Sequence, residues 1–379
     1  MGYRMSFVFR CAALNLSLAV GIGLATDLVV LEPGSSGQLT ALGNEALMQG
    51  RLETAIDHYR RALVIDKAAF QPTFNLALAY QQKGALDEAK RWYEEALKLR
   101  NDHPEVLCNL GFIAFRGDDF TTAVDRFQDA ARQAAATPKD AADYWFNAGA
   151  AREKLRQWAD ARRAYEECLA LNPLHAGGHY NLGSLYLSSL SEQPQALTLA
   201  ERHLAKAHEL APKRSEVLVN LALCHERLGT GDPDQDLARA VAIADADALP
   251  QTLWQRALYN DRCQPPRKTA MRDDLKRLLE IHQDFPGANG KLGTYAFAIA
   301  DYENALRLLE REVAASLAAG RKDLGECHYL LALIYTDHRP DPAKALQHAT
   351  AYYQAHPDSA KIHELRRRAL RLSALATTP

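Results

Sequence analysis

Apolar residues recur three and four positions apart along most of this chain, which is the spacing of an amphipathic α-helix. The stretch from Phe70 to His103 is the cleanest example. Leu76 and Tyr80 fall on one face of a first helix, Gly84 interrupts the pattern, and a second apolar face then follows, formed by Ala89, Tyr93 and Ala96. The pattern predicts two antiparallel helices joined by a short turn.

A short motif, Asn-Leu-Gly or a near copy of it, marks the first helix of successive hairpins; the copies begin at Asn75, Asn109, Asn147, Asn181 and Asn220. The intervals between these asparagines are 34, 38, 34 and 39 residues. Such a period predicts an array in which each unit packs mainly on its neighbours. The extra residues fall at turns, for example between Ser188 and Pro194.

Within each unit the residue sizes are also repeated. A small residue stands at position 8, an alanine at position 20 and an aromatic ring at position 24, as in Gly149, Ala161 and Tyr165. This pattern resembles the tetratricopeptide repeat, a helical hairpin of 34 residues. The resemblance implies an all-α, right-handed superhelical solenoid of about nine helix-turn-helix hairpins with a C-terminal capping helix.

The repeats suggest the following divisions of one elongated solenoid. Residues 36–250 form an array of six repeats, the sixth weak because its second helix, expected near Leu237 to Ala248, lacks the aromatic residue. A degenerate hairpin with Trp254 and the pair Pro265-Pro266 covers 251–285, and two further repeats cover 286–358. The capping helix and a tail occupy 359–379.

The first residues look like an export segment. Arg4 and Arg10 precede an apolar run that ends near Ala25, so residues 1–25 are expected to be a signal peptide or a signal anchor, with a linker at 26–35. The alternative to cleavage before Thr26 is a membrane tether through residues 5–31. In both cases the charge asymmetry places the array on the non-cytoplasmic side, so the protein is expected to be periplasmic or otherwise exported, or anchored in the inner membrane.

The net charge and the cysteine spacing add little to the prediction of function. A net charge of -2 and an isoelectric point near 6.7 give no reason to expect nucleic acid as a partner. The run Arg366, Arg367 and Arg368 is expected to be a solvated helix face. The five cysteines that follow the leader show no framework spacing, and buried structural thiols are the expected reading.

No motif for catalysis, a metal or a cofactor is recognised. Each His-Glu pair lacks the second histidine four residues later that a zinc helix needs. His175 and His179 have ligand spacing, but Pro173 and Gly177-Gly178 interrupt the helix there. The chain is therefore expected not to be an enzyme, with no catalytic residue, metal or cofactor.

Recognition of a partner is the remaining route to function. The resemblance implies that side chains of each first helix line a concave groove, which would place there a ladder of amides, Asn75, Asn109, Asn147, Asn181 and Asn220, beside the aromatic residues Phe74, Phe112, Phe115, Phe146 and Tyr180. An amide can donate to and accept from a peptide backbone. The alternative is that the asparagines bridge adjacent hairpins and the rings fill the space between them.

One recognition mode can be tested on the sequence. Relatives that bind acidic chaperone tails clamp a carboxylate with asparagines and cations. Asn44 and Asn75 fit that clamp, but Thr40, Glu105 and Asn109 stand where cations are required. The acidic chaperone C-terminal tail is thus not an expected partner.

These observations favour a non-enzymatic scaffold that holds a peptide or partner subunit in its groove. The resemblance to the repeat family implies in addition a role in assembly or maintenance of a cell-envelope complex. The alternatives are a membrane-anchored adaptor that faces the cytoplasm and, more remotely, an enzyme with a site between repeats.

Overall fold

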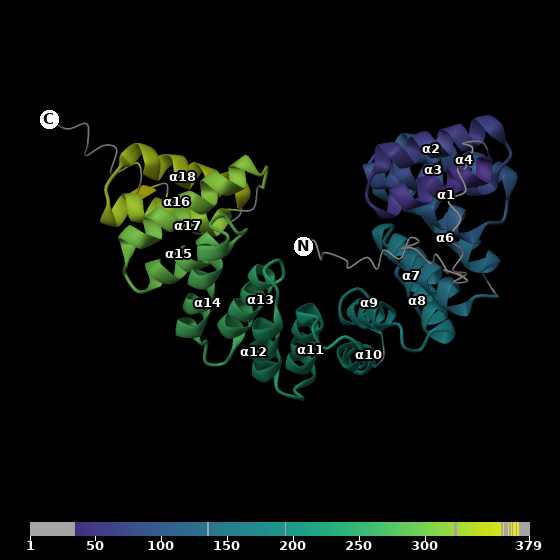
Figure 1. Cartoon of the computed structure of the whole chain (residues 1–379). Helices are drawn as coiled ribbons and strands as arrows, with labels where there is room; N and C mark the ends of the chain where they lie inside the picture. The colour runs from purple at the N-terminus through teal and green to yellow at the C-terminus, as the bar shows by residue number, and fades with distance from the viewer. Residues whose placement is uncertain are drawn as a thin grey trace. The chain divides into compact units, whose positions relative to one another are not determined.

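The computed structural model describes residues 35–134, 136–193, 195–321, 324–357 and 359, together with five positions between 363 and 370. Within these ranges the chain is entirely helical, with eighteen α-helices, one short π-helix and no strand (Figure 1). This confirms the all-α prediction. By its internal contacts the chain divides into two units, Met1–Pro212 with Arg227–Gly229, and Lys213–Glu226 with Thr230–Pro379.

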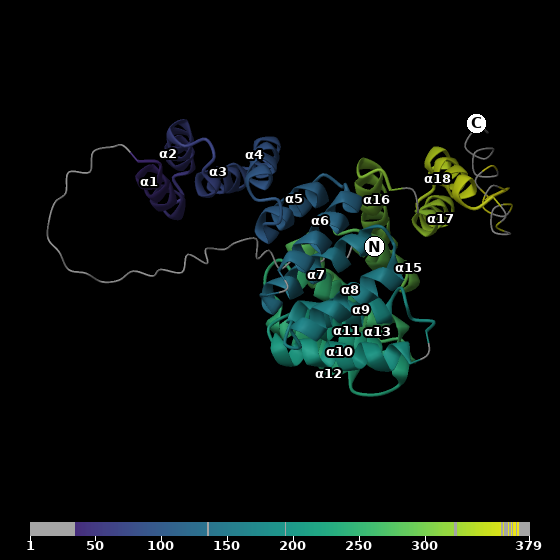
Figure 2. The same ribbon diagram turned by 90° about the vertical axis from the view of Figure 1, so that its right-hand side faces the viewer.

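The first unit consists of five consecutive helical hairpins, which Figure 2 shows following one another from α1 onward. Its helices are α1 (Ser36–Met48), α2 (Leu52–Ile65), α3 (Phe70–Lys83), α4 (Leu86–Leu99), α5 (Pro104–Arg116), α6 (Phe120–Gln133), α7 (Pro138–Lys154), α8 (Trp158–Leu171), α9 (Ala176–Leu187) and α10 (Ala196–Leu210). The first helix of each hairpin is called its A helix and the second its B helix. From α3 onward, each A helix of this unit packs on its own B helix and on the B helix of the preceding hairpin.

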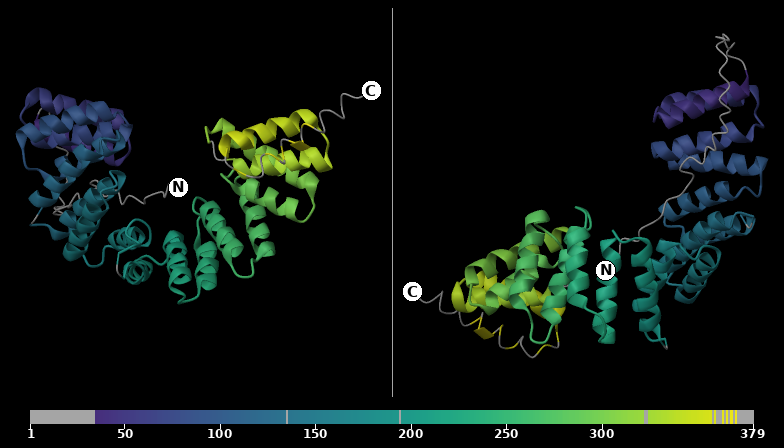
Figure 3. Two further views of the ribbon diagram at one scale, coloured as in Figure 1. Left: turned by 180° about the vertical axis from the view of Figure 1, so that it is seen from behind. Right: turned by 60° about the horizontal axis from the view of Figure 1, so that its bottom comes forward.

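The second unit continues with four hairpins, the green to yellow helices of Figure 3. They are α11 (Ser215–Leu228), α12 (Pro233–Ile243), α13 (Leu249–Arg262), α14 (Lys268–Ile281), α15 (Ala288–Ala298), α16 (Tyr302–Ala318), and α17 (Gly325–Leu333), whose continuation η1 (Ile334–His338) precedes α18 (Pro342–Ala355). The last two residues of α11, Arg227 and Leu228, count with the first unit by their contacts. The described helices thus form nine hairpins, as the repeat pattern predicts.

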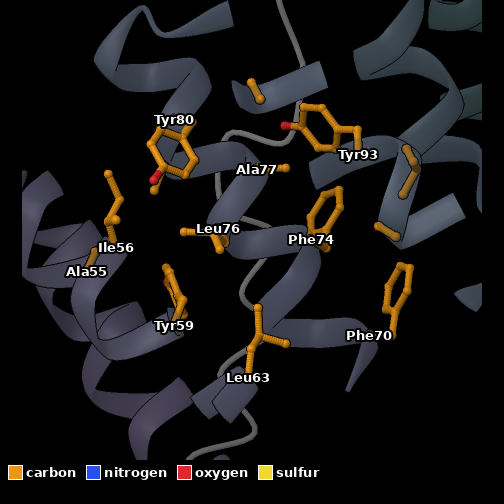
Figure 4. Packing of buried hydrophobic residues seen from close by; sticks show 14 of the residues in the cluster. Ala55, Ile56, Tyr59, Leu63, Phe70, Phe74, Leu76, Ala77, Tyr80 and Tyr93 are labelled. Carbon is orange, nitrogen blue, oxygen red and sulfur yellow. The ribbon is translucent and has the colours of Figure 1, made fainter. Parts of the chain in front are cut away.

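The repeated residue sizes have a steric cause. A Cβ placed on Gly149 would lie 2.6 Å from the Tyr165 ring, and one on Gly111 would lie 2.9 Å from Phe127. Both rings are buried, so the A helix can approach the B helix only where position 8 carries almost no side chain. Figure 4 shows the same arrangement around Tyr93, with Ala77 and Phe74 beside the ring.

Some of the helices start at a residue whose side chain caps them. Ser35 caps α1, because its hydroxyl accepts from the Gln38 amide at 3.1 Å while the Gln38 side chain accepts from the Ser35 amide at 3.2 Å. The second helix of the sixth repeat is expected near Leu237 to Ala248, but in the structure it is α12, which spans Pro233–Ile243 and so begins and ends earlier. Asp232 accepts from the Gln235 amide at 3.0 Å and Pro233 fills the first helical position, so α12 begins four residues earlier.

Several predicted segments lie partly or wholly outside the described residues. These are the signal segment 1–25, the tether 5–31, all of the linker 26–35 except Ser35, and most of the capping helix and tail 359–379. The range 251–285 contains α14 and all of α13 except its first two residues, Leu249 and Pro250. In the part of the chain that the structure describes, no helix has both the length and the apolar character that a membrane crossing requires.

Candidate partner-binding surface

The asparagines of the A helices lie mostly between hairpins. The side chains of four of them are almost fully enclosed, with exposed fractions of 7% for Asn75, 1% for Asn109, 4% for Asn181 and 4% for Asn220. The prediction that these four line an open groove is therefore wrong in this structure. Only Asn147 of the five is half-buried, and a partner could touch it without the hairpins moving.

Asn75 joins the first two hairpins. Its Nδ2 donates to Asn44 Oδ1 at 2.6 Å, and the same oxygen of Asn44 accepts from the Tyr59 hydroxyl at 2.8 Å. Gln71 donates to Asn75 Oδ1 at 3.0 Å. The two asparagines that fitted the carboxylate clamp thus bind each other.

Asn181 joins the fourth and fifth hairpins in the same way. Its Nδ2 donates to the Tyr165 hydroxyl at 3.1 Å, and that hydroxyl donates to Glu153 Oε1 at 2.7 Å. Burial raises the pKa of Tyr165, and the nearby Glu153 carboxylate raises it further. Burial also raises the pKa of Glu153, but the pKa of Tyr165 is raised well above its ordinary value of 10.0, so the shared proton stays on the phenol. These contacts support the alternative in which the asparagines bridge hairpins.

Three of the five predicted aromatic residues are also buried. Phe74 packs on Phe70 and Tyr93, and Phe146 lies 5.9 Å from the Tyr165 ring and 4.9 Å from the His175 ring between centroids. Tyr180 is buried as well. Because all three rings are enclosed, the structure does not support a binding role for them.

Phe112 and Phe115 differ because both are only half-buried. Phe112 packs against the apolar cores on both of its sides, and the Arg116 guanidinium lies 5.9 Å from its ring centroid. Phe115 meets the edge of Phe120 at 5.1 Å. Their rings are held in place by packing and still have accessible area. We define the A-helix surface as five accessible residues of α3, α5 and α7, namely Leu78, Phe112, Phe115, Arg116 and Asn147.

The predicted histidine pair is arranged differently from a metal site. His175 caps α9: its Nδ1 accepts from the Gly178 amide at 2.7 Å, so its Nε2 carries the proton and donates to Asp143 at 3.0 Å. His179 instead contacts His203 on α10, with 3.0 Å between the two Nδ1 atoms. Among the described residues no group of three or more histidine, cysteine or acidic side chains could hold a metal ion.

The contact between His179 and His203 has a counterpart in the ninth hairpin. His328 and His348 approach with 2.9 Å between their Nδ1 atoms, and His348 stacks on Tyr335 much as His203 stacks on Tyr186. Burial, helped by the neighbouring histidine, lowers the pKa of His203 and of His348 to about 4. Neither pair was predicted from the sequence, although the spacing from the A-helix histidine to the tyrosine, seven residues, is identical in the two hairpins.

Two family models match the chain. One, described as a TPR repeat, covers residues 43–84, and the other, described as the tetratricopeptide repeat, covers 73–103 and 142–175.

Curated proteins of similar sequence share part of the chain. Tetratricopeptide repeat protein 8 of Caenorhabditis elegans is 25% identical over 153 residues, which is 40% of this chain and 30% of that protein. The anaphase-promoting complex subunit cut9 of Schizosaccharomyces pombe is 27% identical over 143 residues, 37% of this chain and 21% of the subunit. The chain therefore spans less than a third of the length of these relatives.

Solved structures whose backbone resembles that of this chain include pilF of Pseudomonas aeruginosa and YrrB. YrrB is described as a TPR protein with an unusual peptide-binding site. PilF has a TM-score of 0.47 at 18% identity and covers 64% of this chain and 97% of its own. YrrB has a TM-score of 0.41 at 19% identity and covers 49% of this chain and 91% of its own. Residues 43–103 and 142–175 match the models of the tetratricopeptide repeat, and in the structure they consist of paired helices.

Proposed function

We propose that this chain is a non-enzymatic scaffold that binds a peptide segment or a partner subunit on its A-helix surface. The observation that carries the proposal is the pair Phe112 and Phe115, two half-buried rings on one helix whose neighbours hold them in place. Preset aromatic side chains lose little conformational entropy on binding, and aromatic residues are enriched among those that dominate interface energies.

The kind of partner follows from the same residues. Arg116 beside Phe112 offers a cation, and Asn147 offers an amide that can donate and accept. A partner segment would match this surface if it has an apolar or aromatic side chain for the two phenylalanines, and beside it a carboxylate for Arg116 or a free carbonyl group for Asn147. The relative cut9 is a subunit of an assembly, which agrees with a scaffold role.

The cellular place of this scaffold is part of the proposal. The basic residues and apolar run before residue 26 favour export, and a role in assembling or maintaining a cell-envelope complex follows from that location. Fusing residues 1–35 to alkaline phosphatase and to green fluorescent protein tests it. Phosphatase activity without fluorescence supports export, whereas fluorescence alone favours the cytoplasm-facing adaptor.

Site-specific crosslinking tests the binding surface. A photoreactive phenylalanine analogue replaces Phe112 in the full chain, and a matched analogue replaces the exposed Arg91 on the B helix α4. The expected result is a discrete crosslinked partner from position 112 only, which the Phe115→Ala change weakens at least threefold. Equal crosslinking from both positions would overturn the proposal.

A further inference from the structure

The second unit has a groove that the proposed function does not use. Its lining residues come from α14, from α15, from the turns that follow these two helices, and from α16, and its volume is about 720 Å³. Figure 1 labels these three helices. This volume falls in the range of about 300 to 1,000 Å³ that ligand sites occupy. All of its lining residues belong to one unit, so the site is complete within the second unit.

The floor of the groove is apolar. Leu292 and Ala296 of α15 and Leu308 of α16 form its buried part. Leu279 and Tyr295 are half-buried, and Ile299 at the end of α15 is 57% exposed. Covering an isoleucine this exposed with an apolar side chain of a ligand removes apolar area from water, and this lowers the free energy of the complex.

The walls of the groove carry an excess of positive charge. Four cationic side chains line it, Arg272, Lys276, Arg307 and Arg311, against two carboxylates, Glu280 and Asp301. Asp301 is already engaged as the cap of α16, where it accepts from the Asn304 amide at 3.3 Å and from the Asn304 side chain at 2.6 Å.

Two of these cations have no carboxylate partner among the residues that the structure describes. Arg272 pairs with Asp273 and Arg311 pairs with Asp284, each at 2.7 Å. Lys276 makes no ion pair within the described ranges, and Arg307 donates there only to Asn304 Oδ1, at 3.2 Å. Lys276 and Arg307 come from α14 and α16, so the unpaired charges stand on both walls of the groove.

We propose that this groove binds an acidic amphipathic helix of a partner protein. Its apolar stripe lies on the floor formed by Leu292, Tyr295 and Ile299, and its carboxylates pair with Lys276 on one wall and Arg307 on the other. A groove walled and floored by helices suits a helical ligand, whose apolar residues at i, i+3 and i+4 point into it. The proposal concerns a second binding surface and does not rest on the A-helix surface of the first unit.

Three synthetic 18-residue peptides test the proposal on the full chain. The first has leucine at helical spacing and glutamate at the remaining positions, the second has lysine in place of every glutamate, and the third keeps glutamate but has serine in place of leucine. We expect the first to bind at least tenfold more tightly than either of the others, measured by fluorescence anisotropy at 0.1 M salt, where the Debye length is about 10 Å.

Variants locate the binding. Lys276→Glu with Arg307→Glu should weaken the first peptide at least tenfold, and Ile299→Ser should weaken it about threefold. Lys67→Glu with Arg91→Glu, an equal change of charge at exposed positions of the first unit, is the matched control and should change the affinity less than twofold. All four charged residues are exposed, so circular dichroism should report intact folding.

Several results would overturn the proposal. These are no binding of the first peptide at 1 mM, equal affinity for the glutamate and lysine peptides, or an equal effect of the two charge-reversal pairs. Binding of a single-stranded RNA 20-mer or of phosphatidylglycerol vesicles that depends on Lys276 and Arg307, with no peptide bound, would also overturn it and would assign the groove to a polyanion.

Discussion

The two units build the same kind of hairpin from different chemistry. The large side chains that the first unit encloses completely include the rings of Tyr59, Tyr93, Phe146 and Tyr165, and its described carboxylates are at most half-buried, as Glu153 is. The second unit encloses leucines and a methionine, and it buries three carboxylates, Asp236, Asp274 and Glu312. Each of these has a basic or amide partner nearby.

Glu312 is the clearest case in which a buried charge takes the place of a small apolar residue. It stands at position 27, where the first unit has small residues such as Ala96 and Cys168. Its carboxylate accepts from the amides of Gly287 at 3.0 Å and Gly290 at 3.2 Å, which caps the start of α15. A hairpin of this fold therefore tolerates either size matching or charge pairing at its centre, and the two solutions should fail under different changes.

The largest effect is expected from Arg256→Leu in the second unit. Arg256 donates from Nε to Asp274 Oδ2 at 2.9 Å and from its terminal nitrogen to Oδ1, and Asp274 is only 5% exposed. Removing the arginine leaves a buried carboxylate with a long hydrogen bond from Asn260, at 3.4 Å, so unfolding of α13 and α14 should become easier by roughly 3 kcal/mol. Hydrogen exchange in α13 and α14 measures this.

The double change Arg256→Leu with Asp274→Leu is its control, because it removes both charges and should recover most of the loss. If Arg256→Leu leaves exchange unchanged, charge pairing does not support the second unit.

The matching change in the first unit is Gly149→Val. A Cβ at this position already lies 2.6 Å from the Tyr165 ring, so valine should destabilise the fourth hairpin by about 1 to 3 kcal/mol through overpacking. Thermal unfolding followed by circular dichroism measures the loss. Gly37→Ala in α1 is the control, since no atom lies within 4 Å of its added Cβ, and it should be neutral or stabilising. Equal melting of the two variants would show that size matching is not what the first unit depends on.

Acid should affect both units alike, because each contains one histidine pair. The pKa of His203 and of His348 is lowered to about 4, below the ordinary value of about 6.5 that an unfolded chain restores. The unfolded chain then binds more protons, so this stability is complete above pH 6.5 and is lost as the pH falls toward 4. The loss by pH 5 should be on the order of 1 to 2 kcal/mol per pair.

Urea unfolding at several pH values between 5 and 7.5 measures how steeply the free energy of unfolding changes with pH. The double variant His203→Asn with His348→Asn should flatten this dependence, and a slope that the variant and the parent share would contradict the assignment.

The smallest effect separates two asparagines of the first unit. Asn181→Ala removes the bond to Tyr165 and should cost about 1 kcal/mol. Asn109→Ala should cost less, because Asn109 Oδ1 is buried with no hydrogen-bond partner among the described residues. The melting temperatures of the two single variants, measured in parallel, give the comparison. A lower melting temperature for Asn109→Ala than for Asn181→Ala would show that the hydrogen bond from Asn181 to Tyr165 does not stabilise the fold.

The contrast also explains what the sequence could predict. Size patterns such as Gly149 with Tyr165 recur at a fixed period, so the hairpins and their number were predictable. The segments that match the family models, 43–103 and 142–175, lie in the first unit. Glu312 and Asp274 resemble ordinary solvated helix residues in the sequence, because nothing local shows that a donor on another helix faces them.

The binding surface was harder to predict for a related reason. Asn109 and Asn147 occupy the same motif position, yet one is enclosed and the other half-buried. How far a side chain reaches the surface depends on how closely two hairpins approach, and that distance is set by residues at other positions of the repeat.

The buried polar contacts also differ in how far along the chain they reach. Asp236 with His225, Asp274 with Arg256, and Glu312 with Gly287 and Gly290 each join parts of a single hairpin, whereas Asn75 with Asn44 and Asn181 with Tyr165 join neighbouring hairpins. A gene segment that encodes one hairpin of the second unit would carry both halves of its buried contact when it is duplicated or moved. A hairpin of the first unit that contains Asn75 or Asn181 would leave half of that contact behind, so during evolution these two amide contacts restrict the gain or loss of a hairpin more than the three carboxylate contacts of the second unit do.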